Sequence, residues 1–466
     1  MKKVFVFCIG GTGIRVMKSI TMLMASGMDT NGYAVVPVIL DPHLDLEEKK
    51  NLHSLIESYK NIYDRTINDG NDNSLNPLDG FFNSRIVTLS ELDNQLNDTQ
   101  QFAGSKEKFC SYINVANLAN KNINNYFVQT LFSTKNLDNS LSVGFKGNPN
   151  VGTVVLGEMI EGSDLFKSFK QHCEKGDRVF IISSIFGGTG ASGYPLLEKK
   201  IKGADALPTV KNALMGAVTV LPYYGLKDPS TSGSDIDSAN FYTKTKAALA
   251  YYEKTVKSDY LYYAGETSLM QVYENDEKKQ DDKAHFIELI AATALFDFLK
   301  KEKPDNQQFL TRAIEDAKDS LDLVSLGSGY KDIVKSVADY KLLSCLVDIL
   351  PKERYFPLKK NRGMDDKFYK DAAFQSLKRF TDIYDNWYSE LSTNKRAFAP
   401  LNFGGLDNME GFVKNVSLDA MNDSYYLLEM IKASNANKKE DHSNKFRFFL
   451  QFAYEAVDKY TKKILK

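Results

Sequence analysis

The sequence predicts an α/β protein, in which a parallel, Rossmann-like sheet is followed by a long central helix and a mostly helical C-terminal domain. Three observations predict this class. Short apolar runs are followed by glycine-rich turns and helical stretches, which is typical of parallel strands joined by crossover helices. Residues 283–301 form a long and largely apolar stretch, as in a helix buried on several sides. Beyond residue 305 the chain reads mainly as helices.

The strands are continuous apolar runs rather than alternating ones. Residues 3–9 (KVFVFCI) form the first, and the helical stretch after them ends at Gly27. A second run, 33–40, ends at Asp41. Continuous apolar runs indicate strands covered on both faces. Further strands are expected at 177–185, 212–222 and 259–265, with helices between them.

The predicted nucleotide-binding domain, residues 1–282, contains a polar and asparagine-rich segment at 42–142 that we interpret as an insertion. Its helical pieces are expected at 46–63 and roughly 107–133. After the central helix, residues 302–466 form the C-terminal domain. Helices in it are expected at 306–323, 330–350, 366–394 and 444–465.

Composition narrows the function classes. Lys+Arg 59 against Asp+Glu 60 gives a net charge of -1, which argues against a protein whose main task is to hold nucleic acid. The 4 cysteines lie far apart and form no CxxC pair, so we expect reduced thiols and no structural zinc site. No stretch approaches the ~18 uninterrupted apolar residues of a membrane span. We therefore expect a cytoplasmic protein.

Two glycine-rich segments share one design, in which an apolar strand leads into Gly-Gly-Thr-Gly and then a helix. They consist of Gly10, Gly11, Thr12 and Gly13, and of Gly187, Gly188, Thr189 and Gly190. Such a segment lets backbone N–H groups approach a phosphate at a helix N-terminus. A tight strand-to-helix turn explains a single segment about as well. Two at the carboxyl edge of a parallel sheet favour phosphate binding, because ligands collect at that edge.

The common phosphate-binding motifs fit less well. No GxxxxGK[ST] occurs, so the P-loop with its lysine is absent. The first segment also lacks the dinucleotide fingerprint GxGxxG. Asp41, at the end of the second strand, could still hold a ribose as in NAD enzymes. A Rossmann-type dinucleotide enzyme therefore remains an alternative.

The order of these motifs resembles the tubulin and FtsZ superfamily. Residues 177–195 are similar to the glycine-rich signature loop of FtsZ, and CIGGTGIRVM at 8–17 is similar to its N-terminal loop. Further matches are the NPxVG loop, formed here by Asn148, Pro149, Asn150, Val151 and Gly152, and the ribose-side segment AVTVLPYYG at 217–225 with Pro222. The resemblance covers residues 1–42 and 143–301.

The resemblance implies a tubulin/FtsZ GTPase-type domain that binds GTP, with or without Mg²⁺, and associates with itself or with a protein partner. Arg15 stands where FtsZ has an asparagine, and it could contact a phosphate or be solvated in the first turn of a helix. Gly265 replaces a base-contacting asparagine. Glu266, His285 and Glu288 are substitutes that could read a base edge, since carboxylates accept hydrogen bonds from ring N–H groups. His285 and Glu288 could equally be a helix-start polar residue or the partner of a nearby lysine.

Hydrolysis is left open by the sequence. In the family, an acidic NxDxxD loop of one subunit completes the nucleotide site of the next, and no such motif follows the central helix. Asp316 and Asp319 form only a DxxD remnant, expected on the exposed face of a helix. A non-hydrolysing regulatory module is therefore an alternative to a filament-forming GTPase.

The last helix, residues 445–466, is aromatic on one side and basic toward its end. It could make a peripheral contact with a membrane or dock a partner. The alternative is that it packs back on its own domain.

Overall fold

A computed structural model describes most of the chain. The described residues are 1–43, 47–68, 75–96, 104, 106–118, 123–145, 147–226, 241–266, 271–273, 283–314, 318–353, 363–402 and 444–465. The loop at 229–240, Asp316 and most of the 433–444 linker lie outside them.

A six-stranded parallel sheet forms the centre of the fold, in the order β2-β1-β3-β4-β6-β8. The strands are β1 (Lys3–Ile9), β2 (Ala34–Leu40), β3 (Arg178–Ser184), β4 (Leu214–Val220), β6 (Tyr260–Ala264) and β8 (Gln308–Arg312). The α/β class and the parallel sheet predicted from the sequence are confirmed.

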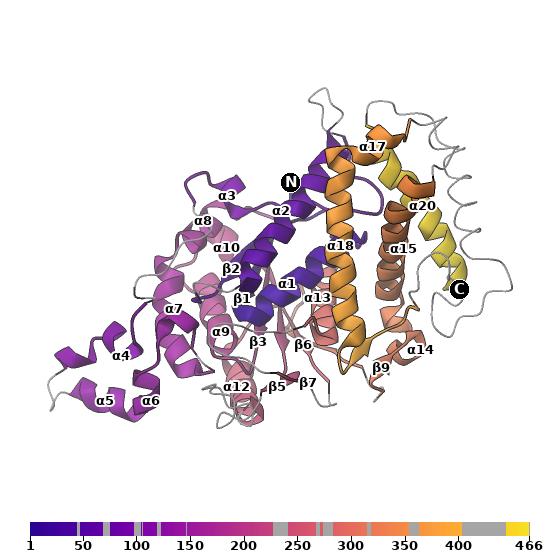
Figure 1. The fold of residues 1–466 in the computed structure, drawn as a ribbon. Coiled ribbons are helices and arrows are strands. Elements are labelled where there is room, and N and C mark those ends of the chain that lie inside the picture. The colour runs from indigo at the N-terminus through magenta and orange to yellow at the C-terminus, as the bar shows by residue number, and fades with distance from the viewer. Residues whose placement is uncertain are drawn as a thin grey trace.

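Helices cover both faces of the sheet (Figure 1). Alternate residues of β1 enter two separate cores: Val4 and Val6 belong to one, and Phe5 and Phe7 to the other. The first face is covered by α1 (Gly10–Ala25), α2 (Glu47–Ile67) and α13 (Phe286–Phe298), and the second by α7 (Pro149–Gly162), α8 (Asp164–His172), α9 (Gly188–Lys202) and α12 (Phe241–Thr255). Continuous apolar strands occur because neither face meets water.

A second layer of helices lies outside α1 and α2. It contains α15 (Lys331–Glu353), α17 (Asp366–Lys370), α18 (Ala372–Thr393) and α20 (Lys445–Ile464). The helix α18 packs on α2 and α15, and α20 packs on α15 and α2. The helix α2, expected within an insertion, therefore packs between α1 and the C-terminal helices.

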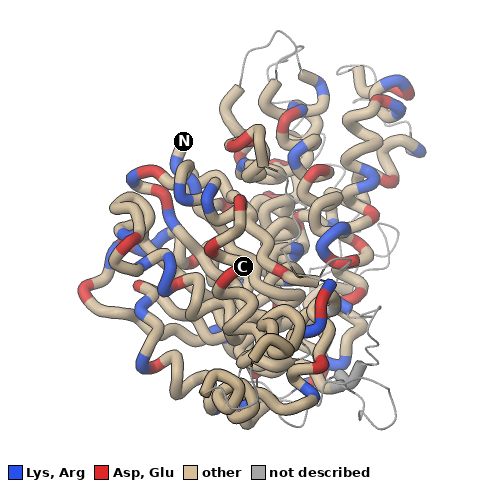
Figure 2. The backbone as a smooth tube through the Cα atoms, turned by 90° about the vertical axis from the view of Figure 1, so that its left-hand side faces the viewer, with Lys and Arg blue, Asp and Glu red and all other residues tan. Residues whose placement is uncertain are grey.

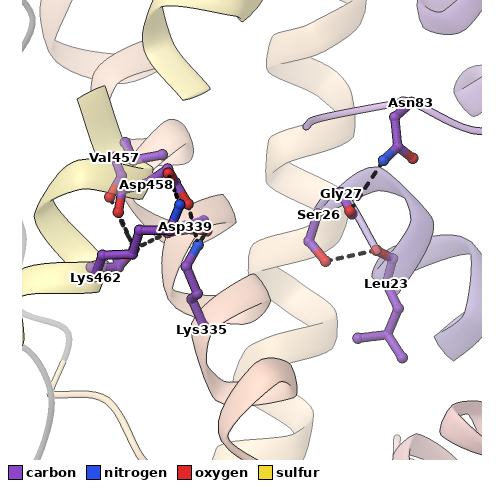
Figure 3. Close-up of polar contacts among 10 residues, drawn as sticks. Leu23, Ser26, Gly27, Asn83, Lys335, Asp339, Val457, Asp458 and Lys462 are labelled. Carbon is purple, nitrogen blue, oxygen red and sulfur yellow. Dashed lines mark hydrogen bonds and ion pairs between the residues drawn. The ribbon is translucent and has the colours of Figure 1, made fainter. Parts of the chain in front are cut away.

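The last helix packs back on the chain, which is the second of the two alternatives for it. Phe449 and Phe452 are buried, and Arg447 donates to the carbonyl oxygen of Thr66 at 2.9 Å. Figure 3 shows Lys335 of α15 between two carboxylates, Asp339 on its own helix at 2.6 Å and Asp458 on α20 at 2.7 Å. The contact between α15 and α20 thus combines apolar burial with charge pairing.

The helix expected at 306–323 is wrong. Residues 308–312 form β8 instead, and the backbone N–H of Gln308 donates to the carbonyl oxygen of Asp259 at 2.9 Å. Pairing with β6 at the sheet edge overrides a weak local preference for helix. The segment continues with β9 (Ser320–Leu321), paired with β10 (Ala397–Phe398), and with the short α14 (Leu323–Leu326). Asp319 is exposed beside β9.

The smaller elements lie at the periphery. The helical stretch expected near 107–133 is divided into α4 (Phe109–Tyr112) and α5 (Ile123–Leu131). The others are α3 (Leu89–Leu92), α6 (Thr134–Leu137), α10 (Pro208–Lys211), β5 (Tyr224–Leu226) and β7 (Gln271–Tyr273). Across the described chain, no helix combines the length and apolar character needed to cross a membrane. Basic residues (Lys and Arg, blue) and acidic residues (Asp and Glu, red) are interspersed on the side shown in Figure 2.

Candidate functional site

The glycine segments meet at the carboxyl edge of β1 and β3, where α1 and α9 begin. The helix α1 starts at Gly10, directly after the strand, and α9 starts at Gly188. A Cβ atom built on Gly10 would lie 3.3 Å from the Cβ of Thr189. One built on Gly188 would lie 3.0 Å from the backbone N of Asn148. All three predicted segments are therefore in contact.

Two glycines are required by packing of each helix on its own strand. A Cβ on Gly13 would lie 2.7 Å from the backbone carbon of Cys8, and one on Gly190 would lie 2.5 Å from the carbonyl oxygen of Ser184. Distances this short exclude a side chain. Gly13 and Gly190 therefore allow a tight strand-to-helix turn, whereas Gly10 and Gly188 allow two chain segments to approach each other.

The NPxVG segment supplies a third helix start. Gly147 has φ of 72°, Asn148 is the N-cap of α7, and Pro149 is its first residue. Gly152, one turn later, faces α9: a Cβ there would lie 2.4 Å from Ser192 Oγ. Lys244 of α12 donates to the carbonyl oxygen of Gly147 at 2.7 Å and brings a cation beside the segment.

Three helix N-termini at one edge create an electropositive region. The first N–H groups of a helix have no partner within the helix, and the helix dipole adds partial positive charge there. Gly11 and Thr189 are half-buried at this edge, and Thr12 is buried. Backbone N–H groups of this kind bind phosphate and carboxylate groups.

Arg15 forms a buried network with Glu288 and Tyr223. Its Nε donates to Glu288 Oε1 at 2.7 Å, and one terminal nitrogen donates to the Tyr223 hydroxyl at 2.8 Å. The Tyr223 hydroxyl in turn donates to Glu288 Oε1 at 2.7 Å. Burial raises the pKa of Tyr223 well above its usual value, so the hydroxyl stays protonated and able to donate. The network ties α1 to α13.

His285 and Phe186 extend this network with aromatic contacts. The backbone N–H of His285 donates to Glu288 Oε2 at 3.1 Å, and its ring lies 4.9 Å from that of Tyr223. The ring of Phe186 lies 4.9 Å from that of Phe241 and 5.6 Å from that of Tyr224. Side chains of this chain therefore fill the space beside the start of α13.

The remaining predicted residues lie in different settings. Glu266 forms an ion pair with Arg396 at 2.7 Å, with both side chains buried. Asp41 accepts a hydrogen bond from the backbone N–H of His43 at 2.7 Å, and burial raises the pKa of this carboxyl. Pro222 is buried just after β4, next to the network residue Tyr223.

The three glycine-containing segments that the sequence analysis singled out lie together in the structure. The sequence analysis did not identify the partners of the charged groups. Lys244, Tyr223 and Arg396 were not singled out. The signal for Tyr223 was its place in the PYYG segment, whereas Lys244 and Arg396 carry no local pattern. Among the described residues, no group of three or more His, Cys, Asp or Glu side chains could hold a metal ion.

No protein-family model matches the sequence, and the search of curated proteins found no match either.

Proposed function

We propose that this chain is a tubulin/FtsZ-like guanine-nucleotide-binding protein whose nucleotide state controls self-association or the docking of a protein partner. The triphosphate of GTP, with or without Mg²⁺, would lie against the starts of α1, α7 and α9. Hydrolysis is not part of the proposal.

The observation that carries the proposal is the convergence of three glycine segments at one sheet edge. The connections that leave β1 and β3 run to opposite sides, so these strands flank a topological switch point of the sheet. Ligands of open α/β sheets bind at such points, outside the carboxyl ends of the strands. The order of motifs along the sequence adds the choice of GTP, by resemblance.

Calorimetric titration of the nucleotide-stripped protein with GTP, ATP and NAD tests the proposal. A Thr189→Asp variant places a carboxylate where the phosphates would lie, and Thr189→Asn is a control of nearly the same shape without charge. Because like charges repel, we expect Thr189→Asp to weaken GTP binding at least about tenfold, or 1.4 kcal/mol, and Thr189→Asn to change it much less.

The ligand that binds most tightly in this titration distinguishes the possible functions. Tighter binding of GTP than of ATP supports the guanine assignment, whereas tight binding of NAD alone would favour a dinucleotide enzyme. Absence of binding by the folded protein to all three ligands would contradict the proposal. Light scattering with and without GTP then distinguishes a filament former from a switch.

A further inference from the structure

A cavity of about 780 Å³ lies on the outer side of the Arg15–Glu288 pair. Its walls come from α1, α2, the start of α13 and α18. This volume is within the range of small-molecule and cofactor sites. The cavity differs from the glycine edge, because none of the glycine-segment residues lines it.

The cavity continues the same face of α1 that begins at the glycine segment. Ile14, Arg15 and Lys18 line it. Gly11 precedes them by three, four and seven residues, the spacing that places residues on one face of a helix. The half-buried first turn at Gly11 is therefore about one helical turn, 5.4 Å, from the cavity wall. A ligand held at that turn can extend into the cavity.

The cavity wall combines apolar and polar groups. Leu52, Leu55 and Trp387 are buried side chains that line it, while Asn51 and Asn386 are exposed at its rim. The indole Nε1 of Trp387 is buried and makes no hydrogen bond within the described part of the chain. A planar ring suits such a wall, because its faces are apolar and its edge carries hydrogen-bonding groups.

The charged residues of the wall favour a ligand with ring N–H groups. Four glutamates line the cavity, against three cationic side chains. Glu288 is paired with Arg15, and Glu390 lies 3.7 Å from Lys18. Carboxylates accept hydrogen bonds but cannot donate them when ionised, so they complement the N–H donors of a guanine edge.

We propose that the base and ribose of the bound nucleotide occupy this cavity, beside Trp387, while the phosphates lie at the glycine segments. The inference rests on the proposed function. It assigns the nucleoside to the α2 and α18 side of Arg15, because Tyr223, His285 and Phe186 fill the space on the other side.

Trp387 is the single tryptophan of the chain and lines the cavity, so its fluorescence reports on this wall of the cavity and on the α18 core around it. We expect GTP to change its emission at the concentrations at which calorimetry detects binding. Inorganic tripolyphosphate, which has no base, should compete with GTP for the glycine segments and leave the emission unchanged. An equal change with tripolyphosphate would overturn the inference.

An Asn51→Tyr variant places bulk at the rim, and Asn61→Tyr is the matched control on the same helix, exposed and outside the cavity lining. We expect Asn51→Tyr to weaken GTP binding about tenfold and tripolyphosphate binding by less than about twofold. Asn61→Tyr should change neither affinity by more than about twofold.

The outcomes separate the two proposals. Binding of GTP that Thr189→Asp weakens, with unchanged Trp387 emission and no effect of Asn51→Tyr, would overturn the cavity assignment and leave the proposed function standing. No binding of GTP or of tripolyphosphate would contradict the proposed function itself, and the cavity assignment with it.

Discussion

Arg15 and Glu288 are opposite charges held out of water, with exposed side-chain fractions of 8% and 1%. Removing charges from water has a large cost, which their attraction and the hydrogen bond from Tyr223 offset. Both residues were singled out from the sequence as possible nucleotide contacts. Their pairing connects two helices separated by 273 positions in the chain, so each depends on the other.

Removing only one of the two charges of the Arg15–Glu288 pair should strongly destabilise the protein. We expect Arg15→Met to lower the free energy of unfolding by about 3–5 kcal/mol, because Glu288 is left buried without its cation. The double variant Arg15→Met with Glu288→Leu should recover much of that loss. Urea unfolding of the single and the double variant measures both the loss of stability and its recovery.

The exposed pair Lys167–Asp164 provides the comparison, since its side chains are 53% and 52% exposed. Lys167→Met should change stability by less than about 1 kcal/mol. An equal loss in Lys167→Met and Arg15→Met, or no recovery in the double variant, would contradict this account of the buried pair.

Glu198 of α9 should make stability depend on pH. Its side chain is buried, and this burial raises the pKa of Glu198 to about 7. Since the pKa is lower in the unfolded chain, the unfolded state loses this proton first, and stability falls as pH rises from about 4.5 to 7. Glu198→Gln can still accept the hydrogen bond from the backbone N–H of Lys257. We expect this variant to be more stable than the parent by about 2–3 kcal/mol at pH 8.

The extra stability of Glu198→Gln over the parent should vanish below about pH 4.5, where the carboxyl of Glu198 is protonated in both the folded and the unfolded state. Thermal unfolding of the parent and the variant between about pH 4 and pH 8 measures this difference in stability. The exposed Glu253 gives a control for the substitution itself, because a surface Glu253→Gln change should alter stability by less than about 0.5 kcal/mol. A gain for Glu198→Gln that is equal at both ends of the range would show that burial of the charge is not its cause.

Among the elements, α7 and α9 make the close contact on which the candidate site depends. A Cβ atom on Gly152 of α7 would lie 2.4 Å from Ser192 Oγ and 2.9 Å from the carbonyl oxygen of Gly188. Gly157, on the same helix, has open space around its Cβ position. Gly152 is thus required by packing, whereas Gly157 only weakens the helix.

Alanine substitutions at these two positions should have opposite effects. We expect Gly152→Ala to destabilise the protein by about 1–3 kcal/mol through overpacking, and to weaken GTP binding because the start of α9 shifts. Gly157→Ala should stabilise it by about 0.5–1 kcal/mol, the usual helix preference of alanine over glycine. Chemical denaturation of both variants tests the contact, and a Gly152→Ala variant as stable as the parent would contradict it.

The elements also show where sequence reasoning succeeds. Strands such as Arg178–Ser184 were predictable because an uninterrupted apolar run admits few other structures, and parallel strands bring their glycine turns to one edge. The strand Gln308–Arg312 was missed because it is polar, mostly exposed and defined by its pairing with β6. The ion pair of Glu266 with Arg396 joins residues 130 positions apart, and no local pattern specifies such a pair.

At the scale of the whole molecule, one hydrophobic core connects the sheet with the C-terminal helices. The same cluster contains Val4 of β1, Tyr59 of α2, Trp387 of α18 and Phe449 of α20. The sequence suggested a C-terminal domain after the central helix. The shared core predicts that the two parts unfold together.

Cooperative unfolding can be measured with two probes of different reach. Emission of Trp387 reports on α18, and far-UV circular dichroism reports on all helices. We expect coincident midpoints in urea, and a lower common midpoint when residues 444–466 are removed, because α20 covers α15 and is held by the ion pair of Lys335 with Asp458. Two separated transitions in the full chain, with the Trp387 change at the lower urea concentration, would show that the C-terminal helices are a domain of their own.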